Sequence, residues 1–457
     1  MAQDELSPQP YSFKDLAARV VKRDGMFYRY LSKSYAKEYQ HLMSSGLYDE
    51  LVNKGLIIEH QELKNHESES EFTVILPEQI PFQSYPFEWS YSQWRKAALA
   101  CLHINTIALQ YGMILKDATP YNFFLKGGKA ILFDTSSFVL FESPNYWLAY
   151  RQYCEEFLGP IALMHYRGHR WGRLTMAALR GMPLDFMSQQ LPSKSYLNFS
   201  CFMHIHLHAK AKNDPSKKTT STSAGFTKEK LEQLFSLLLT TIESWDSCLK
   251  YPNHWAHYYE QDIESVEYLA DKEETIERWI KEIGPESVLD LGANTGKFSE
   301  MASRYAKRVI ALEYDETCVD NIEALINEQK IDNLFTLLGD LTNTTPNLGL
   351  LGEEHSSIFE RAKSDLVLGL ALSHHLLIPG MIPMELMVDL FASLTNKYII
   401  VEYINAEDSK VKILQKTNAR KYPSKEDFEL AFKGKFKMIE TKKMNRANRT
   451  VYLFDIC

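Results

Sequence analysis

The sequence predicts an α/β protein of two domains, with a doubly wound, mostly parallel sheet in the second half. Three observations predict it. Apolar strand-like runs alternate there with helical segments, a glycine-bearing turn follows the first such run, and 457 residues exceed what one core usually holds. Because residues 210–226 are polar and short-chained, we expect a loop or linker there, with domains at residues 1–250 and 251–457.

The composition excludes several classes of protein. Hydrophobic residues make up 45% of the chain, but no apolar run approaches the ~18 residues of a membrane span. The acids Asp4 and Glu5 stand where a signal peptide needs basic residues, and the six cysteines form no C-x-x-C pair. We therefore expect a cytoplasmic protein with no metal site and no membrane partner. A net charge of −8 makes nucleic acid an unlikely partner.

The expected elements of the second half follow in order. A helix at 271–283 leads into five parallel strands, which we expect at 287–291, 308–312, 334–338, 365–370 and 397–403. Helical segments between them, such as 320–329 and 383–395, predict βαβ crossovers. Two further strands, 435–441 and 450–455, are separated by a short polar turn, so they should form an antiparallel hairpin.

The turn after the first strand suits close contact between backbone and ligand. Gly292 and Gly296 have no Cβ, and Asn294 between them is the non-glycine residue that best tolerates a positive φ. The second strand ends at Glu313, 23 residues after Asp290, about where a ribose-binding acid belongs in a doubly wound sheet. This spacing predicts a site for a nucleoside cofactor.

This pattern resembles the first two motifs of class I S-adenosylmethionine (SAM) methyltransferases. The resemblance implies a Rossmann-like seven-stranded sheet with SAM as cofactor. Asp290 and the turn Gly292–Gly296 would hold the methionine part, and Glu313 would accept both ribose hydroxyls. Asp340, just after the third strand, would accept from the adenine amine.

Two alternatives stay open for these residues. A dinucleotide enzyme is one, but its Gly-x-Gly-x-x-Gly motif needs a glycine where Asn294 stands. The other is that a strand-end acid only caps a helix or turn, which we consider most readily for Asp315.

The fourth strand lacks the Asn/Asp-Pro-Pro-Tyr motif of many base and glutamine N-methyltransferases. His374 and His375 stand at its carboxyl end instead, where one of them could act as a general base. The alternative is a histidine pair that only hydrogen-bonds the backbone. The alternating histidines of His204–His208 lack metal-ligand spacing, and we expect them to form a strand face.

A second constellation lies in the first half. Asp117 and Asn122 precede an expected hairpin that turns at Gly127–Gly128, and Asp134 follows it. The set is similar to the catalytic loop and metal-binding acid of aminoglycoside-phosphotransferase-like kinases. The similarity implies that Asp117 orients an acceptor hydroxyl, while Asn122 and Asp134 hold magnesium with ATP.

The departures from those kinases are large. Leu115 stands where they have histidine, no glycine-rich phosphate loop precedes it, and the expected strand at 72–76 has no lysine. The domain is therefore a phosphotransferase, a kinase-derived scaffold that binds substrate or a partner, or a fold in which these residues only complete turns.

Aromatic and polar side chains gather in 81–94 and 146–153, which suits a sugar ring or an interdomain interface. The whole chain resembles two-part bacterial SAM-dependent methyltransferases. We expect transfer of a methyl group to an oxygen or nitrogen of a small-molecule or glycan-like acceptor. A non-catalytic ligand-binding protein and a bifunctional kinase-methyltransferase are the alternatives, and the pattern sets no oligomeric state.

Overall fold

The computed structural model describes residues 15–63, 71–212, 225–246, 265–416, 422–445 and 447–457. The chain divides into two compact units. The first contains residues 1–125, 129–251 and 349–355, and the second contains 126–128, 252–348 and 356–457. Most of the expected linker, residues 213–224, lies outside the described residues.

The first unit begins with a four-stranded antiparallel sheet in the order β1–β2–β4–β3. Its strands and the two helices between β2 and β3 are β1 (Ala18–Arg23), β2 (Met26–Ser32), α1 (Ala36–Ser44), α2 (Leu47–Asn53), β3 (His60–Leu63) and β4 (Glu71–Pro77). Leu31 and Ile75 are fully buried under this sheet, because alternate residues of each strand face the core. The expected strand at 72–76 is confirmed as part of β4.

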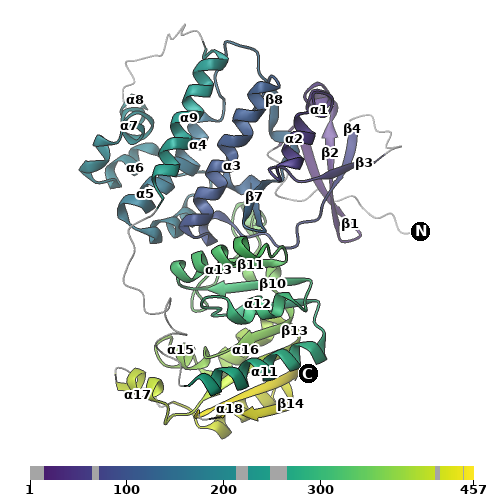
Figure 1. Ribbon diagram of the computed structural model, residues 1–457, viewed down its shortest axis with the longest axis vertical. Coiled ribbons are helices and arrows are strands. Elements are labelled where there is room, and N and C mark those ends of the chain that lie inside the picture. Colours follow the sequence, from purple (N-terminus) through teal and green to yellow (C-terminus); the bar gives the residue numbers. More distant parts are fainter. Residues whose placement is uncertain (1–14, 64–70, 213–224, 247–264, 417–421, 446) are drawn as a thin grey trace. The chain divides into compact units, whose positions relative to one another are not determined.

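Helices dominate the rest of the first unit, and α3 and α9 lie side by side in Figure 1. The α-helices are α3 (Tyr91–Gln110), α4 (Tyr150–Tyr153), α5 (Gly159–Arg167), α6 (Leu184–Gln190), α7 (Phe199–Cys201), α8 (His208–Lys212) and α9 (Lys228–Ser244). Among them run two π-helical segments, η6 (Cys154–Leu158) and η9 (Phe202–Leu207). Fully buried aromatic side chains, including Phe157 and Phe235, fill the core between these helices.

Two small antiparallel sheets flank the residues of the kinase-like constellation, which lie just outside their strands. They are formed by β5 (Met113–Leu115) with β8 (Phe138–Leu140), and by β6 (Phe123–Lys126) with β7 (Lys129–Leu132). The turn between β6 and β7 is Gly127–Gly128, where both glycines have a positive φ of 55° and 75°. The expected hairpin is therefore confirmed.

The expected strand face at His204–His208 is wrong, because these residues lie in η9 and the start of α8. His206 hydrogen-bonds the hydroxyl of Ser195 at 2.8 Å, and His204 hydrogen-bonds that of Tyr150 at 2.6 Å. An alternation of only five residues does not separate a strand from a buried helical turn. The wide π turn brings both histidines to the buried face instead.

The second unit is built on a seven-stranded sheet in the order β11–β10–β9–β12–β13–β15–β14. The strands are β9 (Ser287–Leu291), β10 (Arg308–Glu313), β11 (Leu334–Leu338), β12 (Ser364–Gly369), β13 (Thr395–Ile404), β14 (Phe436–Lys443) and β15 (Arg449–Ile456). The first five are parallel, and β15 is antiparallel to both β13 and β14. The expected α/β fold, five parallel strands and final hairpin are confirmed, with ends within two residues of those expected.

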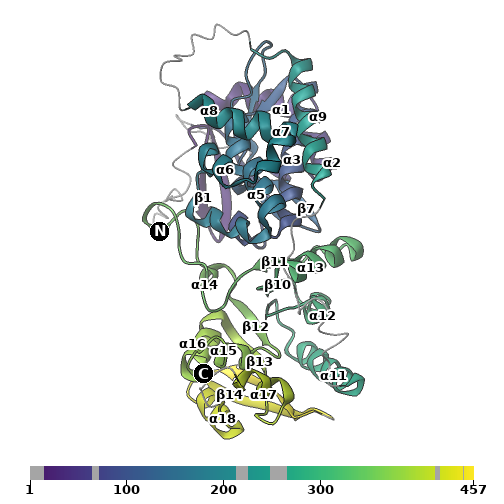
Figure 2. The same ribbon diagram turned by 90° about the vertical axis from the view of Figure 1, so that its left-hand side faces the viewer.

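Helices cover both faces of this sheet. They are α11 (Val266–Ile283), α12 (Lys297–Ser303), α13 (Glu316–Gln329), α14 (Ile358–Arg361), α15 (Ser373–Leu377), α16 (Met384–Leu394), α17 (Ser409–Lys416) and α18 (Lys425–Lys433). Figure 2 shows α11, α12 and α13 on one face and α15, α16 and α18 on the other. None of the helices in the described ranges combines the length and apolar character that a membrane span needs.

The strand order reverses beside β9, since β10 pairs with one edge of it and β12 with the other. In an open parallel sheet the connections leave this point in opposite directions, which opens a crevice at the carboxyl ends of the strands. The residues that follow β9, β10, β11 and β12 therefore gather at one edge of the sheet.

Candidate cofactor-binding site

The turn from β9 into α12 has three residues in the left-handed region. Gly292, Asn294 and Gly296 have φ angles of 70°, 53° and 83°. The N–H groups of Gly292 and Ala293 both donate to the Leu312 carbonyl, at 2.9 and 3.1 Å, which fixes the turn to the end of β10. The sequence predicted that Asn294 can adopt a positive φ, and its φ in the structure is positive.

Gly296 is needed for space as well as for its φ. A Cβ at this position would lie 2.9 Å from Cγ1 of Ile322, a fully buried side chain of α13. A Cβ on Gly292 would lie 3.3 Å from Leu372, in the turn after β12. The backbone of the turn is therefore packed closely against its neighbours, and only glycine fits at Gly296 without movement.

The Glu313 carboxylate is bonded to the backbone of its own site. It is 7% exposed and accepts three N–H groups, from Asn294 at 2.7 Å, Tyr314 at 2.7 Å and Asp315 at 2.9 Å. Burial raises the pKa of Glu313, and these three hydrogen bonds lower it, with the increase prevailing. Since a carboxylate offers about four acceptor positions, about one is left for a ligand hydroxyl.

Asp290 lies deeper, on β9. Its carboxylate is 3% exposed and accepts a hydrogen bond of 2.6 Å from the Ser299 hydroxyl. Burial raises the pKa of Asp290 to about 6, and the negative charge of Glu313 adds to the increase, while the Ser299 bond opposes it. A carboxyl in this state has a strong electrostatic preference for a neighbouring cation.

The other two strand-end acids hold local turns. Asp340 accepts the N–H and the hydroxyl of Thr342 through one oxygen, at 2.8 and 2.7 Å, so its second oxygen takes no bond from the described residues. Asp315 accepts the N–H groups of Thr317 and Cys318 at the start of α13, which is the helix cap that we considered for it.

His374 and His375 are the second and third residues of α15, at the carboxyl end of β12, with ring centroids 3.9 Å apart. His374 is 1% exposed, and neither of its ring nitrogens has a hydrogen-bond partner among the described residues. Burial lowers the pKa of both rings, to about 4 for His375 and further for His374, and nearby cations including Lys410 add to the effect. Both rings are therefore uncharged at neutral pH.

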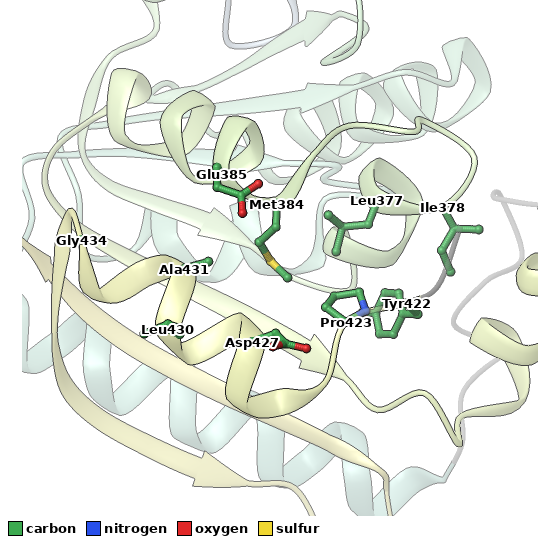
Figure 3. A pocket seen from close by; sticks show the side chains of 10 residues that line it. All are labelled: Leu377, Ile378, Met384, Glu385, Tyr422, Pro423, Asp427, Leu430, Ala431 and Gly434. Carbon is green, nitrogen blue, oxygen red and sulfur yellow. The ribbon is translucent and has the colours of Figure 1, made fainter. Parts of the chain in front are cut away.

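A cavity of about 640 Å³ opens between α15, α16 and α18 (Figure 3), within the size range of small-molecule sites. Its wall combines polar and apolar surface and includes Leu377 on α15, the helix that carries the two histidines. Glu385 and Asp427 add carboxylates, and the side chain of Tyr422 also lines the wall. Sequence periodicity gives no sign of this cavity, because the lining residues come from three separate helices and from the segments beside them.

A group of buried charged residues at the same edge of the sheet was missed by sequence reasoning. Lys272, Glu402, Asp408 and Arg449 are each at most 4% exposed, and the hydroxyl of Tyr268 lies among them. We call these five residues the charge cluster. The signal in the sequence was an isolated acid, Glu402, within the mostly apolar run 398–404.

In the first unit, Asp134 is already saturated by protein groups. Its carboxylate pairs with Arg29 and accepts bonds of 2.6 Å from the Ser136 and Ser137 hydroxyls, 3.1 Å from the Ser136 N–H, and 3.3 Å from the Asn122 amide. The Ser136 hydroxyl has one proton and also lies 2.6 Å from Asp15, so these groups fill the roughly four acceptor positions of the Asp134 carboxylate. A magnesium ion would have to displace them.

Asp117 lies within electrostatic reach of Asp134, and no described residue donates a hydrogen bond to it. Burial and the Asp134 charge raise the pKa of Asp117. Burial also raises the pKa of Glu156 to about 7, against hydrogen bonds from Thr119 and Gln152. The described residues contain no group of three or more acids, histidines or cysteines arranged to hold a metal ion.

No known protein-family model matches the chain. Over 387 residues it is 27% identical to nodulation protein NoeA of Rhizobium meliloti (strain 1021), a match that covers 81% of this chain and 79% of NoeA.

Among solved structures, it is similar to N-methyltransferase NodS from Bradyrhizobium japonicum WM9 in complex with S-adenosyl-L-homocysteine (SAH). That match has 9% identity and a TM-score of 0.33, and covers 45% of this chain and 99% of NodS. Magnesium protoporphyrin IX methyltransferase from Synechocystis PCC 6803, with bound SAH, matches at 15% identity and a TM-score of 0.33, covering 44% and 93% of the two chains.

Proposed function

We propose that the chain is a SAM-dependent methyltransferase, which transfers a methyl group to an oxygen or nitrogen of a small-molecule or glycan-like acceptor. The observation that carries the proposal is the turn Gly292–Gly296 bonded through Asn294 to Glu313, at the point where the strand order reverses. Closely packed backbone beside a buried acid suits a nucleoside cofactor.

Each residue of the site has a proposed role. Asp290 faces the amine of the methionine part, and the turn Gly292–Gly296 lies along it. The remaining acceptor position of Glu313 takes a ribose hydroxyl, and the second oxygen of Asp340 takes the adenine amine. SAM supplies an already electrophilic methyl group, so the protein has mainly to orient the two reactants and accept a proton.

The acceptor side is proposed at the end of β12. His375 is half-buried and uncharged at neutral pH, so its ring can accept a hydrogen bond from an acceptor hydroxyl or amine and orient that group, while its lowered pKa makes it a weak base. The cavity between α15, α16 and α18 suits a ring or chain, with Glu385 and Asp427 able to accept hydrogen bonds from hydroxyl or amine groups. His374 is too buried for direct contact with an acceptor in this conformation.

For the first unit, we propose a scaffold that binds acceptor or partner without phosphoryl transfer. Asp134 is neutralised by Arg29 and saturated by hydrogen bonds, which supports this role over a magnesium site. Phosphoryl transfer needs a metal-bound acid and a phosphate clamp together.

Calorimetry of SAM, SAH and Mg-ATP with the full-length chain tests both proposals. We expect SAM and SAH to bind in the micromolar range and Mg-ATP to give no heat. Glu313→Gln should weaken SAM binding by about tenfold to a hundredfold, the value of a hydrogen bond to a charged group. The control, Glu323→Gln, removes a buried acid that accepts from Thr336 away from the site, and should leave affinity unchanged. Absence of SAM binding to the wild-type protein would overturn the methyltransferase proposal.

A further inference from the structure

The Glu402 carboxylate near the end of β13 collects groups from two other segments of the second unit. One oxygen accepts the Ala371 N–H at 2.9 Å and the Lys272 ammonium at 2.7 Å, and the other accepts the Tyr268 hydroxyl at 2.5 Å. Glu402 itself is fully buried. One side chain therefore joins β13 to α11 and to the turn that follows β12.

Arg449, the first residue of β15, completes the charge cluster. Its guanidinium lies 3.8 Å from Glu402, donates to Tyr268 at 3.1 Å, and pairs with Asp408 at 3.2 Å. Two cations thus face two carboxylates in an otherwise apolar interior. Well-packed hydrophobic residues often stabilise such a position as well as a buried ion pair does. Stability alone therefore does not account for the charges.

Glu402 holds the turn after β12 in two ways. Its side chain binds the N–H of Ala371, which has a φ of 50° in the left-handed region that alanine rarely adopts. Its carbonyl accepts the Ser373 hydroxyl at 3.0 Å. His374 and His375 follow directly, so their position depends on this turn. Strained backbone that is held by several bonds is common at functional sites.

Lys272, the ion-pair partner of Glu402, also contacts residues next to the glycine turn. Lys272 lies over the ring of Phe298, 5.1 Å from its centroid, and Phe298 is the second residue of α12, just after Gly296. The Lys272 charge also acts on Asp290, whose pKa it lowers. The ion pair between Lys272 and Glu402 thus connects the glycine turn to the turn before the histidines.

We propose that Glu402 is a positioning residue of the transferase site, which fixes the Leu370–Ser373 turn relative to α11 and the glycine turn. The inference rests on the proposed function, because it concerns the separation between cofactor and acceptor sides. Methyl transfer requires an in-line arrangement, and a displacement of about 1 Å can cost about a hundredfold in rate.

The test compares Glu402→Leu, Glu402→Gln and Lys272→Met/Glu402→Leu with Glu323→Gln as the control at a buried acid outside the cluster. Three quantities are measured on the full-length chain: thermal unfolding, SAH affinity by calorimetry, and hydrogen–deuterium exchange of the segment 370–377. Glu402→Gln keeps an acceptor for the Ala371 N–H but removes the charge. The same three quantities are measured on it if the leucine variant does not fold.

For Glu402→Leu we expect faster exchange in 370–377 and SAH affinity at least about tenfold weaker. The double variant removes both charges, so its melting temperature should recover while its SAH affinity stays low. Glu323→Gln should change neither exchange in 370–377 nor affinity. Wild-type SAH affinity in the double variant would show a purely structural ion pair and overturn the proposal.

If the wild-type chain itself does not bind SAH, the proposed function is wrong, and the exchange measurement still decides the role of Glu402. Faster exchange in Glu402→Leu but not in Glu323→Gln supports it as the residue that holds the turn. Unchanged exchange overturns it.

Discussion

Glu313 accepts the backbone N–H of Asn294 at 2.7 Å, so the acid that ends β10 also holds the middle of the glycine turn. The carboxylate is therefore part of the turn before any ligand arrives. Loss of the side chain disturbs the backbone and the ligand site together.

Glu313→Ala should consequently destabilise the second unit, contrary to the simple view of Glu313 as a ligand residue alone. Three part-buried N–H groups lose their acceptor, and because water can reach some of them we expect a total cost of about 1–3 kcal/mol. Glu313→Gln keeps one acceptor oxygen and turns its NH2 toward the remaining N–H donors, so it should cost less than the alanine variant. Urea unfolding of both variants checks this, and equal stabilities would contradict the role of Glu313 in the turn.

Gly296→Ala should destabilise the chain more than Gly284→Ala. Both glycines have a positive φ, of 83° and 58°, so each alanine adds about 1–2 kcal/mol of backbone strain. At Gly284 no atom lies within 4 Å of the added Cβ, whereas at Gly296 it would lie 2.9 Å from Ile322. Overpacking adds about 1–3 kcal/mol at Gly296 only. Thermal unfolding of the two variants measures the difference. Equal decreases in melting temperature would mean that the turn and Ile322 move to make room for the added Cβ at no cost.

Asp290 should make stability and cofactor binding depend on pH near 6. Its folded pKa of about 6 lies above its unfolded value, so the stability due to the neutral carboxyl is present below about pH 4 and is lost as pH rises through 6. The full loss is about 3 kcal/mol. Asp290→Asn should remove this dependence, which unfolding curves between pH 4 and pH 8 can follow. A dependence that persists in the variant would assign it to another group.

Binding of a cationic ligand beside Asp290 should favour the ionised carboxyl, and SAM carries such a cation in its amine. We expect SAM binding at pH 6 to release protons and to weaken as the pH falls below 6. Calorimetry in two buffers with different ionisation enthalpies measures the release. Asp290→Asn should abolish it, whereas proton release that is unchanged in the variant would place the coupled group elsewhere.

Arg29→Met should destabilise the first unit by about 3–5 kcal/mol, because it leaves the Asp134 carboxylate buried without its cation. Arg19→Met is the matched control on the neighbouring strand, where a 43% exposed arginine pairs with Glu71 and is worth at most about 1 kcal/mol. The two losses are compared by urea unfolding at pH 7. Similar losses would show that Asp134 does not depend on Arg29.

Mg-ATP offers a second check on Asp134. In the structure the Arg29 guanidinium occupies the side of the Asp134 carboxylate that a magnesium ion would need. We expect no shift in melting temperature with Mg-ATP in the wild-type chain. A magnesium-dependent shift that Asp134→Ala abolishes would restore the phosphotransferase interpretation.

The parts of the fold that were predicted from sequence carry local signals. The residues of β9 and β10 form apolar runs, and Asn294 and Gly127–Gly128 mark backbone that needs a positive φ. Such preferences depend on a residue and its near neighbours, so they can be read directly from the chain.

The parts that were not predicted depend on residues far apart in the sequence. Lys272 and Glu402 are 130 positions apart, and Arg29 and Asp134 are 105 apart. The strand that contains Ile75 has no lysine, and Arg29 lies opposite Ile75 on the neighbouring strand. No local pattern indicates such a pairing, because only the folded sheet brings the partners together.

The position of β15 in the sheet has a consequence for folding during translation. This strand lies between β13 and β14 although it follows both in the sequence. Until the ribosome has translated β15, one edge of β13 has no strand paired to it, and another strand could pair there instead. Arg449 is the first residue of β15, so Glu402 also lacks this cation until β15 has been translated. The β13 edge of the sheet can therefore be completed only after β15 has been translated.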